Sequence, residues 1–155
     1  MELNELTHTI IGAAIRVHAA LGPGLLESAY RACLRHELRL LGVRVESEVP
    51  VPVIYRGLRI DIGYRLDLLV EDQVVVECKT VSRLSTLFEA QLLSHLRLKK
   101  LPAGLLINFH VPPLRDGIRR MTNRYPPDLN PSELDPPKSL PENHAPISGP
   151  PAENI

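Results

Sequence analysis

The sequence predicts an α/β fold in which helices cover both faces of a mixed central sheet. Three observations indicate it. Apolar residues recur at helical spacing over the first forty residues and again over residues 82–99. Segments 64–70 and 74–79 are apolar enough to be central strands, and residues 103–109 form a continuous apolar run. The order helix, helix, strands, helix, strand is that of an α/β/α sandwich.

The composition excludes several classes of protein. The chain has 155 residues and is 44% hydrophobic, which is enough for one domain with a sizeable core. No apolar run is long enough to cross a bilayer, and the start, Met1 to Glu5, is polar and acidic, unlike a secretory signal. We therefore expect a cytoplasmic protein with no membrane partner, whose Cys33 and Cys78 are reduced and buried.

The net charge of zero conceals an asymmetry along the chain. Residues 1–125 contain 17 Lys and Arg and 13 Asp and Glu, a difference of +4, whereas residues 126–155 contain 1 and 5, a difference of −4. We expect residues 1–125 to form the folded domain and the proline-rich residues 126–155 to be a disordered acidic tail, which could recruit a protein partner or screen the body. The late cations form either a phosphate-facing rim or a solvated surface: Arg97, Lys99, Lys100, Arg115, Arg119, Arg120 and Arg124.

Two helices are predicted at the start of the chain, over residues 4–21 and 24–41, with glycine and proline between them. Glu27 lies three residues before Tyr30 and seven before Leu34, so it shares the core-facing side of the second helix. A carboxylate in that position lies in the first helical turn, where the helix dipole favours its ionised form. Tyr30 is expected to be a core residue.

The middle of the chain predicts strands and one more helix. Residues 43–49 alternate as an edge strand does, and residues 51–55 and 58–62 flank a tight turn at Arg56-Gly57. A last edge strand is expected over residues 117–122. Ser82 or Ser85 can cap a helix that runs to about Lys99. Its predicted apolar stripe consists of Leu87, Ala90, Leu93 and Leu96.

The hairpin formed by residues 64–79 carries charges where a central sheet should be apolar. Asp67, Glu77 and Lys79 lie in its two arms, and an unpaired buried charge costs several kcal/mol. Side chains alternate along a strand, so Glu77 and Lys79 share one face while Cys78 points to the other. Something must compensate these charges.

The length of the turn between the two strands decides whether Asp67 lies on the same face as Glu77 and Lys79. A two-residue loop at Glu71-Asp72 would place Asp67 opposite Val76 and away from Glu77. A three-residue loop ending at Gln73 sets Asp67 directly across from Glu77. We favour the second register, because carboxylates gathered on one face can share a divalent cation.

These residues resemble a known family. Asp67, followed after an apolar strand by Glu77-Cys78-Lys79, is similar to the signature of the PD-(D/E)XK nuclease superfamily, and Gly24-Leu25-Leu26-Glu27-Ser28-Ala29-Tyr30 resembles the motif of its GxxExxY branch. The resemblance implies a restriction-endonuclease-like core. It runs from about Leu6 to Arg124, and it includes Val17-His18, Leu21-Gly22-Pro23-Gly24, Gln91-Leu92-Leu93 and Gly104-Leu105-Leu106-Ile107-Asn108-Phe109.

The resemblance also implies a chemistry, the hydrolysis of phosphodiester bonds in nucleic acid with Mg²⁺, or alternatively Mn²⁺. It implies Asp67, Glu77, Glu27 and the backbone carbonyl of Cys78 as metal ligands, with Lys79 orienting or activating the attacking water.

Three further polar residues are weighed beside these. Gln91 and His95 face the same way on a helix, and the pair resembles the Gln-x-x-x-Tyr of RecB-like nucleases, with His in place of Tyr. Gln91 and Arg65 are expected to contact nucleic acid or to support the ligands. Their alternatives are an ordinary helix glutamine and, for Arg65, a salt bridge to Asp67. For the whole chain, the alternative is a catalytically silent module that holds nucleic acid or a protein on the same fold.

Overall fold

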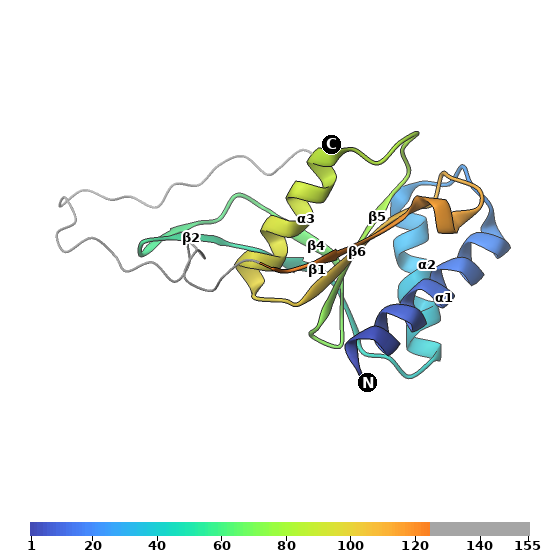
Figure 1. The fold of residues 1–155 in the computed structure, drawn as a ribbon, viewed down its shortest axis with the longest axis horizontal. Helices are drawn as coiled ribbons and strands as arrows, with labels where there is room; N and C mark the ends of the chain where they lie inside the picture. Colours follow the sequence, from blue (N-terminus) through green and yellow to red (C-terminus); the bar gives the residue numbers. More distant parts are fainter. Residues whose placement is uncertain (125–155) are drawn as a thin grey trace.

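A computed structural model describes residues 1–124 of the chain (Figure 1). The predicted tail, residues 126–155, lies outside the described residues. The elements in chain order are α1 (Leu3–Leu21), α2 (Glu27–Leu40), β1 (Val45–Pro50), β2 (Val53–Tyr55), β3 (Leu58–Ile60), β4 (Arg65–Val70), β5 (Val74–Lys79), α3 (Thr86–Lys99), β6 (Ala103–Asn108), the short 3-10 helix η1 (Leu114–Gly117) and β7 (Ile118–Thr122).

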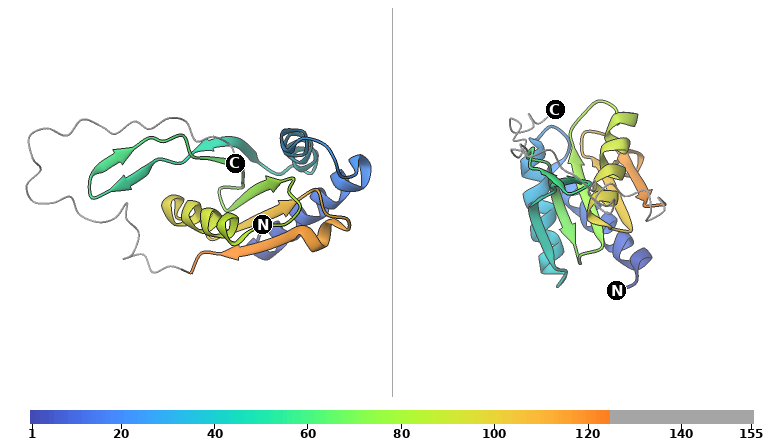
Figure 2. Two further views of the ribbon diagram at one scale, coloured as in Figure 1. Left: turned by 90° about the horizontal axis from the view of Figure 1, so that it is seen from above. Right: turned by 90° about the vertical axis from the view of Figure 1, so that its left-hand side faces the viewer.

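The main sheet has five strands in the order β1-β4-β5-β6-β7. All neighbours are antiparallel except β5 and β6, which run parallel because α3 connects them as a crossover. The sheet is therefore mixed, and β1 and β7 are its edge strands, as predicted. Figure 2 shows α1 and α2 on one side of the sheet and α3 on the other. The predicted α/β/α architecture is confirmed.

Two apolar cores fill the space between these layers. On the side of α1 and α2, the helices contribute Leu6, Ile10, Tyr30 and Leu34, among others, against Leu68, Val76, Ile107 and Phe109. On the side of α3, a smaller core joins Leu92 and Leu96 to Val75, Leu106 and the root of the β2–β3 hairpin. Burial of apolar surface at about 25 cal/mol per Å² is the main force that holds the three layers together.

The second sheet is a two-stranded hairpin, β2 and β3, which projects from the body as an arm (Figures 1 and 2). Its turn is at Arg56 and Gly57, whose φ angles are 45° and 86°. Positive φ at both positions is the geometry of the tight hairpin turn that the sequence predicts. At the base of the arm the Val51 N–H donates to the Tyr64 carbonyl at 2.8 Å.

The second and third helices differ from their predictions. α2 begins at Glu27 rather than near Gly24, because residues 22–26 form a loop before it. α3 begins at Thr86, with Ser85 as its cap: the Ser85 Oγ accepts from the Phe88 N–H at 3.3 Å.

The predicted apolar stripe of α3 is mostly wrong. Leu87 is 58% exposed and Ala90 is also exposed, Leu93 is half-buried, and Leu92 and Leu96 are the buried residues. Leucines lie on several sides of this helix, so its spacing did not define one face. None of the described helices is long and apolar enough to cross a membrane.

Candidate functional site

The β4–β5 hairpin has the three-residue loop that the sequence favoured. Val70 pairs with Val74, Leu69 with Val75 and Leu68 with Val76. Glu71 and Asp72 adopt positive φ angles of 50° and 54°, so the loop turns tightly. The Glu71 carboxylate also accepts from the Arg44 N–H at 2.7 Å, which ties the turn to the start of β1. This register brings Asp67 to the level of Glu77.

Regular alternation along β4 stops at Asp67. Leu66 and Leu69 both pack on the α3 side, whereas Leu68 packs on the side of α1 and α2. Cross-strand pairing with β5 begins only at Leu68. Where the strands separate, the Asp67 Oδ2 accepts from the backbone N–H of Cys78 at 2.9 Å. The Asp67 carboxylate therefore lies between the two strands.

Arg31 approaches Asp67 from α2. Its Nη1 is 3.5 Å from Asp67 Oδ1, and its Nη2 is 3.8 Å from Glu48 Oε1. Glu48 has a positive φ of 55° and interrupts the regular pairing of β1 with β4. Arg31 thus balances part of the negative charge where β1, β4 and α2 meet. Sequence analysis missed this residue, since its partner lies 36 positions away.

Glu77 is the most deeply placed acidic group of the site, with only 12% of its side chain exposed. Burial raises the pKa of Glu77 from 4.5 to about 7, and the negative charge of Asp67 adds to the shift while His95 and Lys79 oppose it. Its Oε1 is buried and has no hydrogen-bond partner among the described residues. Its Oε1 lies 3.8 Å from the His95 Nδ1 of α3, which is too far for a hydrogen bond, and this nitrogen likewise has no hydrogen-bond partner among the described residues.

Lys79 ends β5 beside these carboxylates. Its Nζ lies 4.6 Å from the centre of the Phe88 ring, a cation–π contact that positions the ammonium group. Its positive charge lowers the pKa of both Glu27 and Glu77, against the effect of their burial. Its carbonyl accepts from the Phe109 N–H at 2.8 Å, which fixes the end of the strand.

Glu27 completes the group from the first turn of α2, where it is half-buried. Burial raises its pKa, and after burial the largest influences are the charges of Lys79 and Asp67. The predicted inward direction of Glu27 is thus consistent with the fold.

Tyr30, one turn later, holds the loop before Glu27. Its hydroxyl donates to the Gly22 carbonyl and accepts from the Leu25 N–H at 3.1 Å, and its ring stacks on Phe109 at 4.5 Å. As expected, it is a core residue.

The other residues that the sequence predicted for the site are less directly associated with the carboxylates. The Cys78 thiol is fully buried on the α1–α2 side, and burial raises its pKa, so the metal proposal concerns its backbone carbonyl alone. Cys33 is also a free thiol but is only half-buried, which corrects its predicted burial. Gln91 is exposed on α3, and Arg65 is exposed at the start of β4. His95, one turn after Gln91, faces Glu77.

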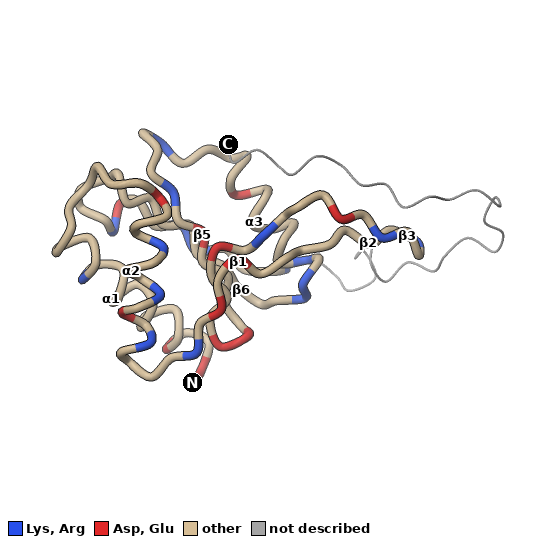
Figure 3. The backbone as a smooth tube through the Cα atoms, turned by 180° about the vertical axis from the view of Figure 1, so that it is seen from behind, with Lys and Arg blue, Asp and Glu red and all other residues tan. Residues whose placement is uncertain are grey.

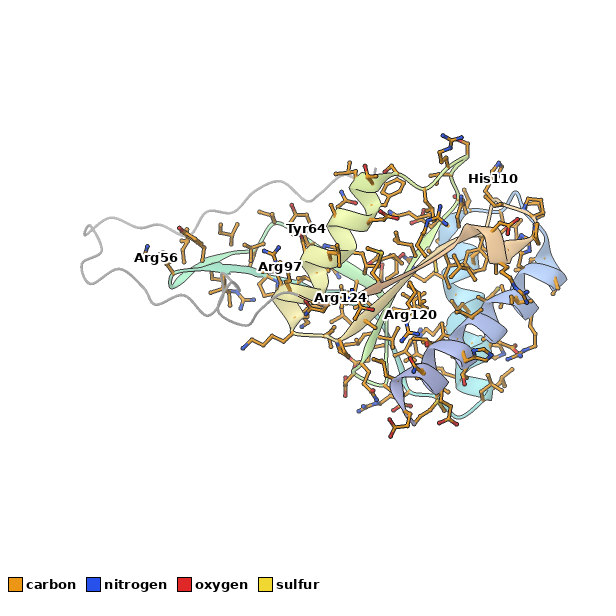
Figure 4. All side chains as sticks on the ribbon, viewed as in Figure 1. Arg56, Tyr64, Arg97, His110, Arg120 and Arg124 are labelled. Carbon is orange, nitrogen blue, oxygen red and sulfur yellow. The ribbon has the colours of Figure 1, made fainter. Side chains whose placement is uncertain are left out.

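The late cations do not form one rim. Arg119 pairs with Glu89 on the α3 side at 3.7 Å, whereas Arg120 donates to the Asn4 side chain of α1 at 2.7 Å. Figure 4 shows Arg97 on α3, and Asn123, the neighbour of Arg124, bonds to the Leu96 and Leu101 carbonyls at the end of that helix. The single basic rim considered from the sequence is therefore split over different surfaces.

Two further residues support the site, and the sequence assigned neither of them a role. Asn108 is buried at the end of β6, where its Nδ2 donates to the Val81 carbonyl at 2.7 Å and its Oδ1 accepts from the Val81 N–H at 3.1 Å. The signal was a polar residue inside an apolar run. Tyr64 packs its ring 5.7 Å from the His95 ring, between the arm and α3 (Figure 4).

The donor set fits a divalent cation by its chemistry. Asp67, Glu77 and Glu27 offer carboxylate oxygens, which Mg²⁺ prefers, and one oxygen of Glu77 is buried without a hydrogen bond. Within residues 1–124, however, no three His, Cys, Asp or Glu side chains gather closely enough to hold an ion by themselves. Mg²⁺ keeps several of its waters, so two carboxylates with a backbone carbonyl meet its needs.

Comparison with known proteins assigns the family. Searches of curated proteins and of solved structures gave no match. A family model described as the PD-(D/E)XK nuclease superfamily matches residues 4–121, which is most of the chain and contains each of the proposed ligands and Lys79. With a mixed sheet flanked by helices and an Asp, Glu, Lys group at the separated ends of two strands, the chain belongs to the PD-(D/E)XK nuclease superfamily.

Proposed function

We propose that this protein is a Mg²⁺-dependent nuclease that hydrolyses phosphodiester bonds in nucleic acid. Asp67, Glu77, Glu27 and the Cys78 carbonyl would hold the ion, and Mn²⁺ would substitute for Mg²⁺ because it takes the same oxygen ligands. The positions of Gly24, Glu27 and Tyr30 support the GxxExxY branch: Gly24 adopts a φ of 108° in the loop, Tyr30 holds that loop, and Glu27 begins the helix.

The observation that carries the proposal is the state of Glu77. A buried carboxylate oxygen without a hydrogen bond is costly, because His95 and Lys79 offset only part of the hydration that the group loses. Asp67 on the neighbouring strand makes the cost greater, since it raises the pKa of Glu77 further. A bound cation would remove the cost of burying this carboxylate. A need for catalysis would explain why the protein tolerates that cost in its free state.

Each side chain has a distinct task in the proposed reaction. The ion, when bound, lowers the pKa of water and neutralises phosphate charge. Lys79 places its ammonium group, held over Phe88, where it orients the attacking water and offsets charge that develops on the phosphate. Gln91 and Arg65 would contact the nucleic-acid backbone from α3 and from the start of β4, where both are exposed.

Cleavage of single- and double-stranded DNA and RNA, with Mg²⁺ and with EDTA, tests the proposal. We expect Mg²⁺-dependent cleavage that the Lys79→Ala variant loses by about 10²-fold or more. Arg39→Gln, which removes an exposed charge at the far end of α2, is the matched control and should retain full activity. Full activity of Lys79→Ala would overturn the role of Lys79, and cleavage that persists in EDTA would overturn the role of the cation.

One observation favours a second function, a catalytically silent module that binds nucleic acid or a protein. Both oxygens of Asp67 have partners, Oδ1 at 3.5 Å from Arg31 and Oδ2 at 2.9 Å from the Cys78 nitrogen. A carboxylate already engaged in this way is less available to a metal ion. Titration calorimetry with Mn²⁺ separates the two functions, because the nuclease requires binding that Glu77→Gln abolishes, whereas the silent module requires none.

A further inference from the structure

The β2–β3 arm is a described part of the chain whose shape the proposed catalytic site does not explain. β2 and β3 pair with each other and not with the five-stranded sheet. A two-stranded hairpin alone is marginally stable in water, so such an arm is expected to gain from a partner. Figures 1 and 2 show that it points away from the body.

The root of the arm is anchored next to the proposed catalytic site. Val51 and Leu66, on either side of the arm, are buried against Leu96 and Leu101 of the α3 side. Tyr64 packs on His95, which in turn faces Glu77. β4 continues from the arm, and Asp67 is its third residue. Whatever the arm holds is therefore held in a fixed relation to the site.

Positive charge concentrates on this part of the molecule. Asn123, close to Arg124, bonds to the Leu96 and Leu101 carbonyls, so the end of the described chain lies at the end of α3. Residues 51–65, 97–100 and 123–124 together carry seven Lys and Arg and one Asp, whereas the rest of residues 1–124 carries ten and twelve. Figure 3 shows the Lys and Arg positions along the arm and beside the end of α3. A polarised charge of this kind steers a polyanion to one face.

The arm also has suitable side chains at its tip. Arg56 lies at the turn, and Figure 4 shows it at the far end of the arm. Tyr55, beside it, is 50% exposed. Arg59 follows on β3, where it pairs with Asp61 at 3.1 Å and is exposed. Guanidinium groups with an exposed aromatic ring are suited to phosphates and base edges.

From these observations we propose that the β2–β3 arm is a binding arm for double-stranded DNA that enters its major groove; this rests on the proposed nuclease function for the site to which the duplex is delivered. The major groove of B-DNA is about 12 Å wide and admits a two-stranded ribbon. The corresponding groove of an RNA duplex is deep and narrow, and side chains cannot read it. A second copy of the chain fits less well, because it would bring two positively charged arms together.

The length of the arm sets the expected footprint. Arg56 precedes Asp67 by eleven residues. At about 3.3 Å per residue the extended chain spans at most about 36 Å, close to one turn of duplex at about 34 Å. The arm therefore contacts DNA up to about one helical turn to one side of the bond at the site. Duplexes that end closer than this to the bond should bind more weakly.

The test measures binding by fluorescence anisotropy with the full chain in EDTA, using a DNA duplex of about three turns, its single strand and an RNA duplex. The variant is Arg56→Asn with Arg59→Thr. Asn favours the positive φ of 45° found at Arg56, and Thr favours strands, so the arm keeps its fold while it loses both charges. The matched control, Arg39→Gln with Arg115→Gln, removes two exposed charges from α2 and η1.

We expect the arm variant to bind duplex DNA at least about ten-fold more weakly, with a salt dependence reduced by about two ion equivalents, and to bind the single strand and duplex RNA as before. Unchanged affinity for duplex DNA would overturn the proposal, and so would an equal loss for all three nucleic acids or an equal loss in the control. A wild-type dimer that the arm variant dissociates would make the arm a self-association surface instead. Because no cation is present, failure of the nuclease assay leaves this result unaffected.

Discussion

The two faces of the central sheet are built for different tasks, and β5 serves both of them. Val74, Val76 and Cys78 face α1 and α2 and belong to the large apolar core on that side. Val75 faces α3, and Glu77 follows it on that side, against His95. One face therefore stabilises the fold, and the other accepts a cost to hold charged groups. The alternation of this strand separates its own apolar and charged side chains, while Glu27 and Arg31 contribute charges to the site from α2, in the layer on the apolar side.

The largest effect on stability should come from the apolar face. Leu68→Ala removes a fully buried side chain from the α1–α2 core and should lower the free energy of unfolding by about 4 kcal/mol. Leu69→Ala, its neighbour on the α3 side, is 8% exposed and should cost only about 2 kcal/mol. Urea unfolding of both variants measures the difference. Equal costs would contradict the contrast between the two faces.

Glu77→Gln should stabilise the protein while it abolishes cleavage. The folded state raises the pKa of Glu77 from 4.5 to about 7, so it prefers the protonated form, and stability without cation is full below pH 4.5 and falls as the pH rises to about 7. Gln mimics the protonated group. In EDTA we expect a gain of up to about 3 kcal/mol at pH 8 and almost none at pH 4, measured by urea unfolding.

The matched control for this variant is Glu46→Gln, at an exposed position of β1. It should change the free energy of unfolding by less than about 0.5 kcal/mol at either pH. If Glu77→Gln were neutral or destabilising at pH 8, the Glu77 carboxylate would have a compensating partner in the free protein, and the proposal that it binds a cation would lose its support.

The smallest effect concerns the loop before Glu27. Tyr30→Phe removes a hydroxyl that bonds to the Gly22 carbonyl and the Leu25 N–H, and it leaves both groups unpaired. We expect a loss of about 1–2 kcal/mol in unfolding free energy and a few-fold weaker Mn²⁺ binding. The exposed Tyr55→Phe is the control and should change neither. Unchanged affinity for Mn²⁺ in Tyr30→Phe would show that the loop before Glu27 does not influence metal binding.

Much of the fold could be predicted from local patterns. Alternation left two registers of β4 and β5 open, and the three-residue loop was favoured because it gathers the carboxylates of Asp67 and Glu77; the structure confirms that loop. The glycine at position 57 predicted the tight turn at Arg56-Gly57. The buried face of α3 could not be predicted, because Leu87, Leu92, Leu93 and Leu96 lie on several faces of the helix. Packing against β6 and the root of the arm selects Leu92 and Leu96 as the buried pair.

The members of the proposed site came from local sequence patterns, but its geometry did not. Periodicity identified Glu27, and the charged hairpin identified Asp67, Glu77 and Lys79. The break in alternation at Asp67 was not predictable, because the separation of β4 from β5 depends on contacts with Arg31 and with the Cys78 backbone. Such contacts join residues far apart in sequence, and no local pattern encodes them.

Contacts between the end of β6 and the segment after β5 limit how far the chain could be truncated without disturbing the proposed site. All four proposed catalytic side chains occur before residue 80, yet the peptide that follows Lys79 is held by Asn108, and the Lys79 carbonyl is bonded to Phe109. A Cβ on Gly117 would lie 2.6 Å from the Asn108 carbonyl oxygen, so the turn into β7 closes tightly over the same point. A truncated chain that ended before β6 would contain the proposed catalytic residues without the strand that holds them in place.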